Sequence, residues 1–433
     1  MEYSTASGSE STQKWPQLSL REAGIDLIDC DHRTPSVCEA GFPYVAIPQL
    51  KEGHLDLADA RLISADDFED WTRKAKPQAH DVVLSRRCNP GETAYVPEGK
   101  TFAVGQNLVL LRSKGTKVYP PFLRWLTRGP EWWDQIEKYL NYGAVFDSLK
   151  CADVPNFTLT IPPLPEQRCI AHILGTLDDT IELNRRMNAT LEGMARALFR
   201  SWFVDFDPVR AKAEGRRPAG MDAATAALFP DGFAESELGE IPKGWKLATL
   251  KDGAVVYDAR RIPLSSLERA QRKGQYPYYG AASIVDYVDD YLFEGVHILV
   301  GEDGTVVNAE GSPVVQYVWG KFWVNNHAHI LKGKDPISTE QLLIFLKASD
   351  VSPLITGAVQ PKITQENLLS LPFILPDREI SFRFSEIIRP LCDRIRVNAD
   401  GARSLSALRN ALLPRVLSGD LPVHSLHPKE MVA

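Results

Sequence analysis

The sequence predicts an α/β fold of the α+β type, with two globular units separated by two long antiparallel coiled-coil helices in a pseudo-twofold internal repeat. Three observations predict it. The chain of 433 residues is long for a single hydrophobic core. It also matches itself at a shift of 214 residues, since GAV at Gly143–Val145 returns at Gly357–Val359. Finally, each half ends in a long segment whose apolar residues return every three or four positions.

The internal repeat extends well beyond one tripeptide, which favours duplication over chance. TLDDTIELN at Thr176–Asn184 aligns with PLCDRIRVN at Pro390–Asn398 at the same shift. Fainter matches precede the helices in the same order: WPQLSL with WKLATL, FPYV with YPYY, and FAVGQNLVLLR with FWVNNHAHILK. We therefore expect each half to be a globular α/β unit followed by a long helix.

Both long helices show the 3.5-residue repeat of a coiled-coil seam, at 170–202 and 388–416. Arg409 interrupts the second seam, and we expect Leu408 beside it to fill the gap. If the helices pair, Asn184 and Asn398 are polar seam residues that fix the register. The alternative is that each helix lies on its own globular unit. The residues expected to pair the helices are Leu177, Ile181, Asn184, Leu191, Leu198, Leu391, Ile395, Asn398, Leu405 and Leu412.

Local signals predict where these helices begin. Thr176 with Asp179 resembles a capping box, and Pro390 suits the first turn of the second helix. A helix from Leu177 to Trp202 would be about 39 Å long at about 1.5 Å per residue. That length is close to one turn of B-DNA, about 34–36 Å. Two related units at opposite ends of an antiparallel pair could then read two short sequences separated by an unread gap.

The composition restricts the class of protein. An apolar fraction of 44% and a charged fraction of 24% are typical of a soluble globular protein. The sequence contains no apolar run of about eighteen residues, so we expect no membrane span. We also expect the polar start to be neither a signal peptide nor an anchor. The six cysteines form no CxxC pair, which favours a reduced cytoplasmic compartment. The net charge of −7 restricts any DNA contact to local patches.

Several strings resemble type I restriction–modification specificity subunits. PPLPEQRCIAHILGTLDDTIELNRRMNATLEGMARALFRSWFVDFDPV, which begins at Pro162, resembles their central region, and GAVQPKITQENLLSLPFILP, which begins at Gly357, resembles their distal region. YPYYGA, LVGEDG and NNHAHIL are similar to their second target-recognition domain. The resemblance implies two DNA-reading domains held apart by the helices. It also implies the partners: double-stranded DNA, two methyltransferase (modification) subunits and a translocating restriction subunit.

The repeat and the resemblance together predict the domain boundaries. We expect a disordered tail at 1–14, target-recognition domain 1 at 15–160, a central conserved helix region at 161–204, a connector at 205–244, target-recognition domain 2 at 245–374, a distal conserved helix region at 375–421 and a tail at 422–433. The connector is punctuated by proline and glycine, and its apolar residues Phe206, Leu228, Phe229 and Phe233 need a surface. That surface is either a methyltransferase subunit or the chain's own helix.

The sequence lacks the motifs of a DNA-modifying enzyme. The nearest match to an amino-methyltransferase motif is YPPF at Tyr119–Phe122, where a phenol is a poor acceptor and two prolines that open a helix are the better explanation. Pro230-Asp231 and Pro376-Asp377 lack the Asp/Glu-x-Lys partner of a nuclease, and no glycine-rich cofactor turn or P-loop is present. We expect no catalytic residue and no cofactor in this chain, with S-adenosylmethionine, ATP and magnesium bound by partner subunits.

Metal ligands are too few for a predicted site. His327 and His329 alternate on an expected strand and make half a zinc site, while Cys30, His32 and Cys38 lie in the other half. We therefore expect no metal. Two other functional classes remain as alternatives: a DNA methyltransferase with a fused recognition domain, and a coiled-coil scaffold that does not touch DNA. A pull-down with sequence-specific DNA protection separates them.

The candidate DNA contacts follow from the side chains that read base edges or phosphates. LSRRCNPGE offers arginines and an asparagine in an expected loop after the strand DVVL. The second domain offers two basic stretches and the GEDG loop, whose glycines permit close backbone approach. An ordinary solvated charge is the alternative for each. The candidates are Arg86, Arg87, Asn89, Arg260, Arg261, Arg272, Lys273, Tyr279, Gly280, Gly301, Asp303 and His327.

Overall fold

The computed structural model describes residues 15–31, 33–143, 145–237, 239–357 and 360–423. The chain forms two compact units: unit 1 comprises Met1–Glu182 with Arg403–Ala433, and unit 2 comprises Leu183–Ala402. The predicted tail at 1–14 and His32 lie outside the described residues. Within those residues, no helix is both long and apolar enough to cross a membrane.

Unit 1 is built around an antiparallel four-stranded sheet in the order β2-β10-β7-β8. A smaller sheet in the order β6-β3-β9 contains one parallel pair, between β3 and β9. The strands of unit 1 are β1 (Gln17–Ser19), β2 (Ile25–Asp29), β3 (Phe42–Val45), β4 (Leu50–Lys51), β5 (His54–Leu55), β6 (Leu62–Ile63), β7 (Val82–Ser85), β8 (Thr93–Tyr95), β9 (Ala103–Val104), β10 (Leu108–Ser113) and β11 (Thr158–Thr160).

The strand β10, which lies inside the four-stranded sheet of unit 1, contributes side chains to two hydrophobic clusters. Successive side chains of a strand point to opposite faces, so Val109 and Leu111 enter one cluster while Leu108 and Leu110 enter another. The shorter helices of unit 1 are α1 (Ala65–Thr72), α2 (Leu123–Leu126) and α3 (Pro130–Tyr139). The Ser64 hydroxyl caps α1 by accepting from the Asp67 amide. Two prolines open the turn before α2, as the sequence predicted for YPPF.

Unit 2 repeats the strand order of the four-stranded sheet of unit 1, and its second sheet has one strand more. Its four-stranded sheet has the order β15-β22-β19-β20, and its second sheet again contains one parallel pair, between β16 and β21. The strands of unit 2 are β12 (Phe233–Ser236), β13 (Gly239–Pro242), β14 (Lys246–Thr249), β15 (Ala254–Val256), β16 (Lys273–Tyr279), β17 (Ile284–Val288), β18 (Phe293–Glu294), β19 (His297–Gly301), β20 (Val315–Val318), β21 (Lys321–Val324), β22 (Ala328–Gly333) and β23 (Pro372–Leu375). The shared strand order confirms the predicted internal repeat.

The shorter helices of unit 2 are α5 (Asp207–Ala213), α6 (Ala223–Leu228), α7 (Leu250–Gly253), α8 (Ser266–Gln271), α9 (Thr339–Ala348) and α10 (Gln365–Leu369). The connector packs on the unit's own long helices. Phe206 and Phe229 are buried, at 7% and 2% exposure, in a cluster with Trp202, Trp245 and Phe384. The chain itself therefore covers these connector aromatics, and the alternative of a partner-facing Phe206 and Phe229 is wrong.

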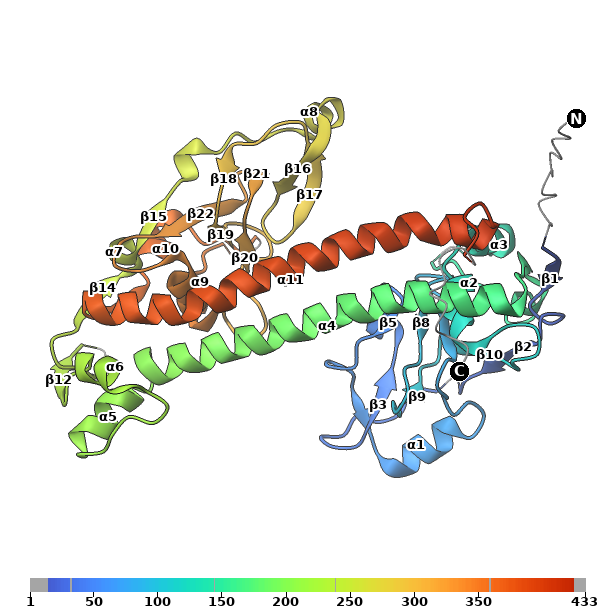
Figure 1. Ribbon diagram of the computed structural model, residues 1–433, viewed down its shortest axis with the longest axis horizontal. Coiled ribbons are helices and arrows are strands. Elements are labelled where there is room, and N and C mark those ends of the chain that lie inside the picture. The colour runs from blue at the N-terminus through green and yellow to red at the C-terminus, as the bar shows by residue number, and fades with distance from the viewer. Residues whose placement is uncertain (1–14, 32, 144, 238, 358–359, 424–433) are drawn as a thin grey trace, which may run out of the picture. The chain divides into compact units, whose positions relative to one another are not determined.

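Two long helices, α4 (Leu164–Phe203) and α11 (Arg378–Ser418), each pass through both units (Figure 1). They pair within unit 2, where the Asn398 side chain donates to Asn188 Oδ1 at 2.9 Å and Asn188 donates to the Ile395 carbonyl at 3.1 Å. They pair within unit 1 through Asp178 and Arg409. The predicted antiparallel helix pair is confirmed.

The predicted helix starts are wrong. Both helices begin more than ten residues earlier, so Thr176 and Pro390 lie inside helices rather than at their first turns. The Thr176 hydroxyl instead donates to the His172 carbonyl one turn back. The expectation for Leu408 is also wrong, because Leu408 is 48% exposed while Arg409 is 7% exposed. An ion pair, rather than a leucine, fills the gap in the seam.

Candidate functional site

Three loops of unit 1 meet at one end of its sheets, and we call them the loop edge of unit 1: Arg86–Asn89, Gly105–Asn107 and the described residues 141–143 and 145–148. Backbone hydrogen bonds join them. The Arg86 amide donates to the Asn107 carbonyl at 2.9 Å, and the Leu149 amide donates to the Arg86 carbonyl at 2.9 Å. An isolated bridge links Arg87 to Ser148. Segments far apart in sequence are thereby fixed into one surface.

The corresponding loops of unit 2 form the loop edge of unit 2: Gly301–Gly304, Asn325–His327 and the described residues 356–357 and 360–362. The Glu302 amide donates to the His327 carbonyl, and the Ile363 amide donates to the Glu302 carbonyl, both at 2.9 Å. An isolated bridge links Asp303 to Lys362. These bonds repeat those of unit 1 one for one. Arg86 is therefore the structural equivalent of Glu302, and Arg87 that of Asp303.

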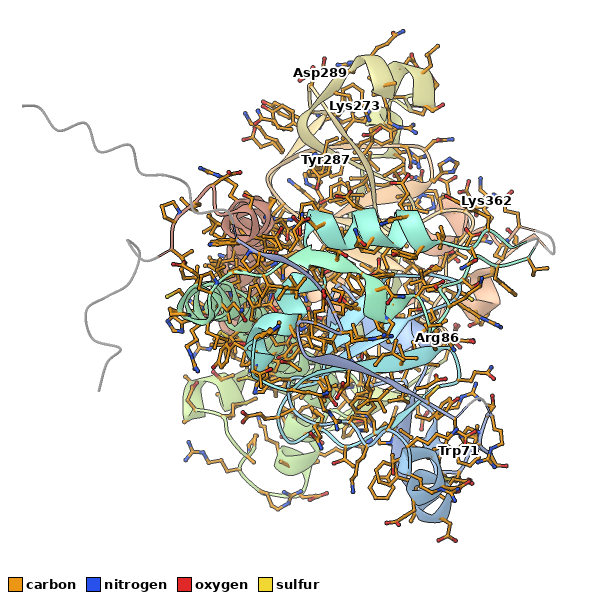
Figure 2. The ribbon with its side chains drawn as sticks, turned by 90° about the vertical axis from the view of Figure 1, so that its right-hand side faces the viewer. Trp71, Arg86, Lys273, Tyr287, Asp289 and Lys362 are labelled. Carbon is orange, nitrogen blue, oxygen red and sulfur yellow. The ribbon has the colours of Figure 1, made fainter. Side chains whose placement is uncertain are left out.

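Arg86 and Arg87 lie differently on the loop edge of unit 1. Arg86 is half-buried and donates to the Leu149 carbonyl at 3.4 Å, so it supports the loop (Figure 2). Arg87 and Asn89 are exposed. Between them, Cys88 adopts a positive φ of 63°, which is uncommon outside glycine and turns the loop sharply. Of the basic residues predicted here, Arg87 is the one whose side chain can reach a ligand.

Exposed aromatic side chains accompany these residues, and they were not among the predicted contacts. Tyr142 is 76% exposed and Phe146 is 59% exposed, both on the segment that bridges to Arg87. Large apolar groups exposed together on a short segment are unusual and point to an interaction surface. The sequence NYGAVFD, two aromatic residues in a stretch flanked by polar residues, is the sequence signal for this surface.

Behind the loop edge of unit 2 lies a cluster of charged side chains, the charged cluster, formed by the largely enclosed Asp258, Arg261, Glu302 and His329 with the half-exposed Lys362. Arg261 donates to Glu302 at 2.6 Å, and Lys362 contacts the other Glu302 oxygen at 3.1 Å. The His329 Nδ1 atom lies 2.6 Å from an Asp258 oxygen. Arg261 also donates to the Ala328 carbonyl at 3.0 Å. Arg261, a predicted DNA contact, thus joins these loops through its internal bonds, and its contact with DNA stays a prediction.

The charges of this cluster shift the acidity of its members. Burial alone would raise the pKa of Glu302, but the hydrogen bonds from Arg261 and Lys362 lower the pKa below its ordinary value. Burial alone would lower the pKa of His329, but its bonds to Asp258 and to the Ile363 carbonyl, with the charge of Glu302, raise the pKa above its ordinary value. His329 is therefore the counter-charge of Asp258.

Asp258, Glu302 and His329 also place potential ligand atoms within 4.8 Å of one another, which is metal-site spacing. Arg261 and Lys362 already neutralise Glu302, however, and His329 directs Nδ1 at Asp258 and Nε2 at a carbonyl 2.9 Å away. The positive charge that a divalent cation would bring is thus supplied by side chains. We interpret this group as a structural ion-pair network.

Asp303 and His327 form the outer pair of the same edge. The His327 Nδ1 atom lies 2.6 Å from Asp303 Oδ1, with the two side chains 46% and 20% exposed. The Asn325 side chain accepts from the His327 amide at 2.8 Å and fixes the turn. Gly304 has a φ of 79° and open space on the side where a Cβ atom would lie, so it turns the loop without steric hindrance. The predicted candidates Asp303 and His327 therefore lie together at the surface.

Glycines bring two further candidates to this edge, whereas Tyr279 belongs to the core. A Cβ atom on Gly280 would lie 3.7 Å from Asn325, and one on Gly301 would lie 3.3 Å from the Ala281 carbonyl. Gly280 and Gly301 are thus close-approach positions between loops. Tyr279 is only 8% exposed and packs edge-on against Phe322 at 5.8 Å, so its ring is not available to a ligand.

The remaining basic candidates contact groups outside the loop edge of unit 2. Arg272 contacts Asp289 at 2.9 Å, and Lys273 contacts Asp286 at 2.6 Å, on or beside the β16–β17 hairpin (Figure 2). Arg260 lies over the Phe293 ring at 5.1 Å. The structure therefore gathers Gly280, Gly301, Asp303 and His327 and leaves out Arg260, Arg272 and Lys273.

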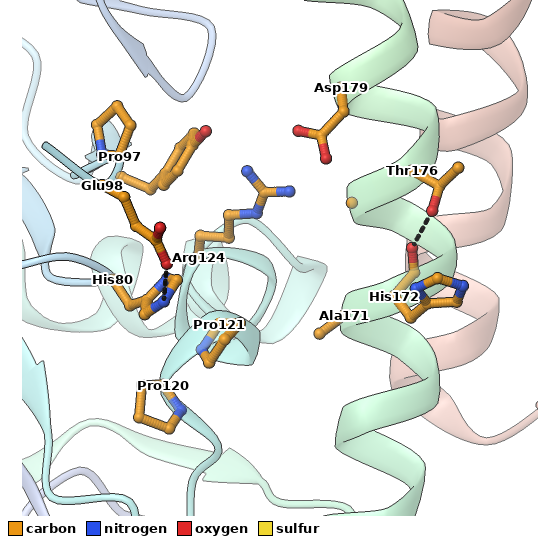
Figure 3. Close-up of a pocket in the computed structure, with 12 residues that line it drawn as sticks. His80, Pro97, Glu98, Pro120, Pro121, Arg124, Ala171, His172, Thr176 and Asp179 are labelled. Carbon is orange, nitrogen blue, oxygen red and sulfur yellow. Dashed lines mark hydrogen bonds and ion pairs between the residues drawn. The ribbon is translucent and has the colours of Figure 1, made fainter. Parts of the chain in front are cut away.

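Unit 1 also contains a polar cleft that the sequence did not reveal, because its walls come from distant segments. It has a volume of about 280 Å³ and lies between α4 and the loops that follow β8 and precede α2 (Figure 3). His80 faces Glu98 at 3.8 Å on one wall, and His172, Thr176 and Asp179 line the helix wall. The mixture of opposite charges at the wall does not define one ligand chemistry.

Comparison with known proteins follows the same division of the chain. A sequence model of the type I restriction modification DNA specificity domain matches residues 35–193 and 242–401, together more than half of the chain. The chain belongs to the type I restriction–modification specificity family. It carries two copies of the family's domain, as the sequence resemblance implied.

Individual relatives of this specificity subunit are distant. A protein of Haemophilus influenzae named putative type I restriction enzyme specificity subunit S.HindORF215P is 33% identical over 147 residues, 34% of this chain and 37% of that protein. The HindI specificity subunit of the same organism is 24% identical over 405 residues, 78% of this chain and 86% of the relative. A crystal structure of a type I S subunit from M. genitalium has a TM-score of 0.57 at 14% identity, covering 94% and 97% of the chains, which shows the shared fold.

Proposed function

We propose that this specificity subunit reads a bipartite duplex DNA target, one short sequence with the loop edge of each unit. The observation that carries the proposal is the loop edge itself, whose backbone bonds are repeated in two units with equivalent four-stranded sheets. Each loop edge presents polar side chains of the kind that bind base edges: the exposed Arg87 and Asn89 in one, and the Asp303–His327 pair, with side chains 20% and 46% exposed, in the other. A chain with net charge −7 needs such local surfaces to approach DNA.

The chain contributes recognition and not chemistry in this proposal. It docks two methyltransferase subunits and a restriction subunit in the cytoplasm, and those partners bind S-adenosylmethionine, ATP and magnesium. Relatives named as type I restriction enzyme specificity subunits support the assembly. The absence of a methyltransferase, P-loop or nuclease motif from the sequence supports a recognition role.

The test reconstitutes the full chain with its methyltransferase subunits and determines the methylated DNA motif by sequencing. We expect a motif of two short sequences separated by a fixed number of unread base pairs. The purified chain alone should neither methylate nor cleave DNA, and methyl transfer by the chain free of partner subunits would contradict the non-catalytic role.

Variants on the loop edges test where the reading occurs. Arg87→Ala should reduce the free-energy preference for the correct base in one half-site by about 1–3 kcal/mol. The preference for the other half-site should be unchanged. Lys273→Ala, whose side chain contacts Asp286 on the hairpin, serves as the matched control and should leave both sequences unchanged. Equal weakening of binding to all DNA sequences by Arg87→Ala would mean a phosphate contact instead.

A further inference from the structure

The two loop edges carry opposite charges at equivalent positions. Arg86 and Arg87 in unit 1 correspond to Glu302 and Asp303 in unit 2, as the repeated backbone bonds and bridges establish. In each pair the first residue is the more enclosed one: Arg86 is half-buried, and Glu302 is held by Arg261 and Lys362. The second residue of each pair lies nearer the surface: Arg87 is exposed, and Asp303, whose Oδ1 atom lies 2.6 Å from His327 Nδ1, is 20% exposed.

An acidic residue at a DNA-reading edge has few possible partners. Phosphates repel a carboxylate, so Asp303 cannot contribute a backbone contact. In the major groove, the groups that donate to a carboxylate are the exocyclic amino groups of cytosine and adenine. Lys362 is joined to Asp303 by a backbone bridge and is 45% exposed, and its ammonium group lies 3.1 Å from Glu302. A carboxylate at this position is therefore better matched to a base amino group than to a phosphate.

The equivalent arginine requires the opposite chemistry. A guanidinium donates to acceptors, and the guanine O6 and N7 pair matches its fork best. At the same backbone position, unit 1 therefore presents a hydrogen-bond donor and unit 2 presents an acceptor. This contrast does not depend on the identity of the remaining loop residues.

We infer that Asp303 determines specificity in one half-site by accepting a hydrogen bond from the exocyclic amino group of a cytosine or adenine, whereas Arg87 binds a guanine in the other half-site. This inference rests on the proposed function, because it takes the loop edges as the DNA-reading surfaces. It predicts that the two half-sites differ in the kind of base that each unit requires.

The experiment uses the full chain assembled with its methyltransferase subunits. The methylated motif is first determined by sequencing for the wild type, Asp303→Asn and the control Asp290→Asn, an exposed aspartate beyond β17 in the same unit. We expect Asp303→Asn to relax one cytosine or adenine position of a single half-site about tenfold or more, because an amide also donates to guanine and thymine. Asp290→Asn should leave the motif unchanged.

Duplexes that lack one amino group then test the contact itself. Replacing the relaxed base by its analogue without the exocyclic amino group should weaken wild-type binding about tenfold. The same replacement should have no further effect on the Asp303→Asn complex. Equal weakening of both complexes, or an unchanged motif in Asp303→Asn, would overturn the inference.

Arg87→Gln separates this inference from the proposed function. If Arg87→Gln weakens the requirement for a guanine in one half-site while Asp303→Asn changes neither half-site of the motif, only the role of Asp303 is wrong. If neither variant changes the motif of an active complex, the loop edges do not read DNA and both fail. Should Asp303→Asn bind no DNA, Asp303→Glu decides, since retained base preference supports the contact and lost binding overturns it.

Discussion

Arg409 of α11 donates to the carboxylate of Asp178 on α4 inside unit 1, and the two residues are only 7% and 2% exposed. His54 approaches the second Asp178 oxygen at 3.1 Å, and Arg124 approaches it at 3.6 Å. Burial alone would raise the pKa of Asp178, but the bond and charge of His54, with Arg124 and Arg409, lower the pKa well below its ordinary value. One carboxylate thus joins α4, α11, β5 and α2.

We expect Asp178→Ala to lower the free energy of unfolding by about 3–5 kcal/mol, because it leaves buried cations without a counter-charge. Arg409→Ala should cost less, since Asp178 keeps His54 and Arg124. Urea-induced unfolding of the purified chain measures both.

The repeat supplies a matched control for this ion pair. At a shift of 214 residues Asp178 and Arg409 correspond to Cys392 and Ala195, which are each 3% exposed. The double variant Asp178→Cys with Arg409→Ala, which copies unit 2, should therefore be more stable than Asp178→Ala. Equal stability of the two would show that Arg409 is not the group stranded by loss of the carboxylate.

The aromatic cluster of unit 2 gives a second prediction. Phe384 of α11 is fully buried against Phe199, Trp202 and Phe203, with ring centroids 4.9–6.0 Å apart. Phe384→Ala should lower the free energy of unfolding by about 3–5 kcal/mol. Phe382, on the same helix but 61% exposed, is the control, and Phe382→Ala should change it by no more than about 0.5 kcal/mol. Similar losses for the two variants would contradict the packing.

Periodicity predicted the helices well and their boundaries poorly, for a physical reason. The 3.5-residue repeat reports which face is buried along the whole helix, and it identified the pair correctly. Capping signals are local, however, and a threonine such as Thr176 satisfies its hydroxyl equally well inside a helix. Arg409 looked like a flaw because its partner Asp178 lies 231 positions away in sequence. Long-range ion pairs leave no mark in a periodic pattern.

The predicted DNA-reading residues also differ in their structural surroundings, because their partners lie far away in sequence. Residue type alone placed Arg87, Arg261 and Arg272 in one class, because each is a basic residue in or near an expected loop. The structure separates them by their partners: Arg261 donates to Glu302, Arg272 contacts Asp289, and Arg87 is exposed. Gly301 lies where two loops approach closely, a backbone property that glycine in the sequence does record, and its contact with DNA stays a prediction.

The charged cluster of unit 2 makes a prediction about pH. His329 is 1% exposed and bonded to Asp258, and its pKa is raised above the ordinary value. His297, 3% exposed and surrounded by aromatic rings, has its pKa lowered to about 4 by burial and by the charge of Lys332. These two histidines of the same unit should therefore respond to pH in opposite directions.

We expect the stabilisation from His329 to be complete below the unfolded-state pKa of about 6.5 and to be lost as pH rises through its raised folded-state pKa. The loss of unfolding free energy caused by His329→Gln should thus be larger near about pH 6 than near about pH 9. His297→Gln should show the reverse, because a depressed pKa makes native His297 unfavourable only where the unfolded chain binds the proton. Urea unfolding across this range measures both, and parallel pH profiles for the two variants would refute the assignment of His329 as the protonated partner of Asp258.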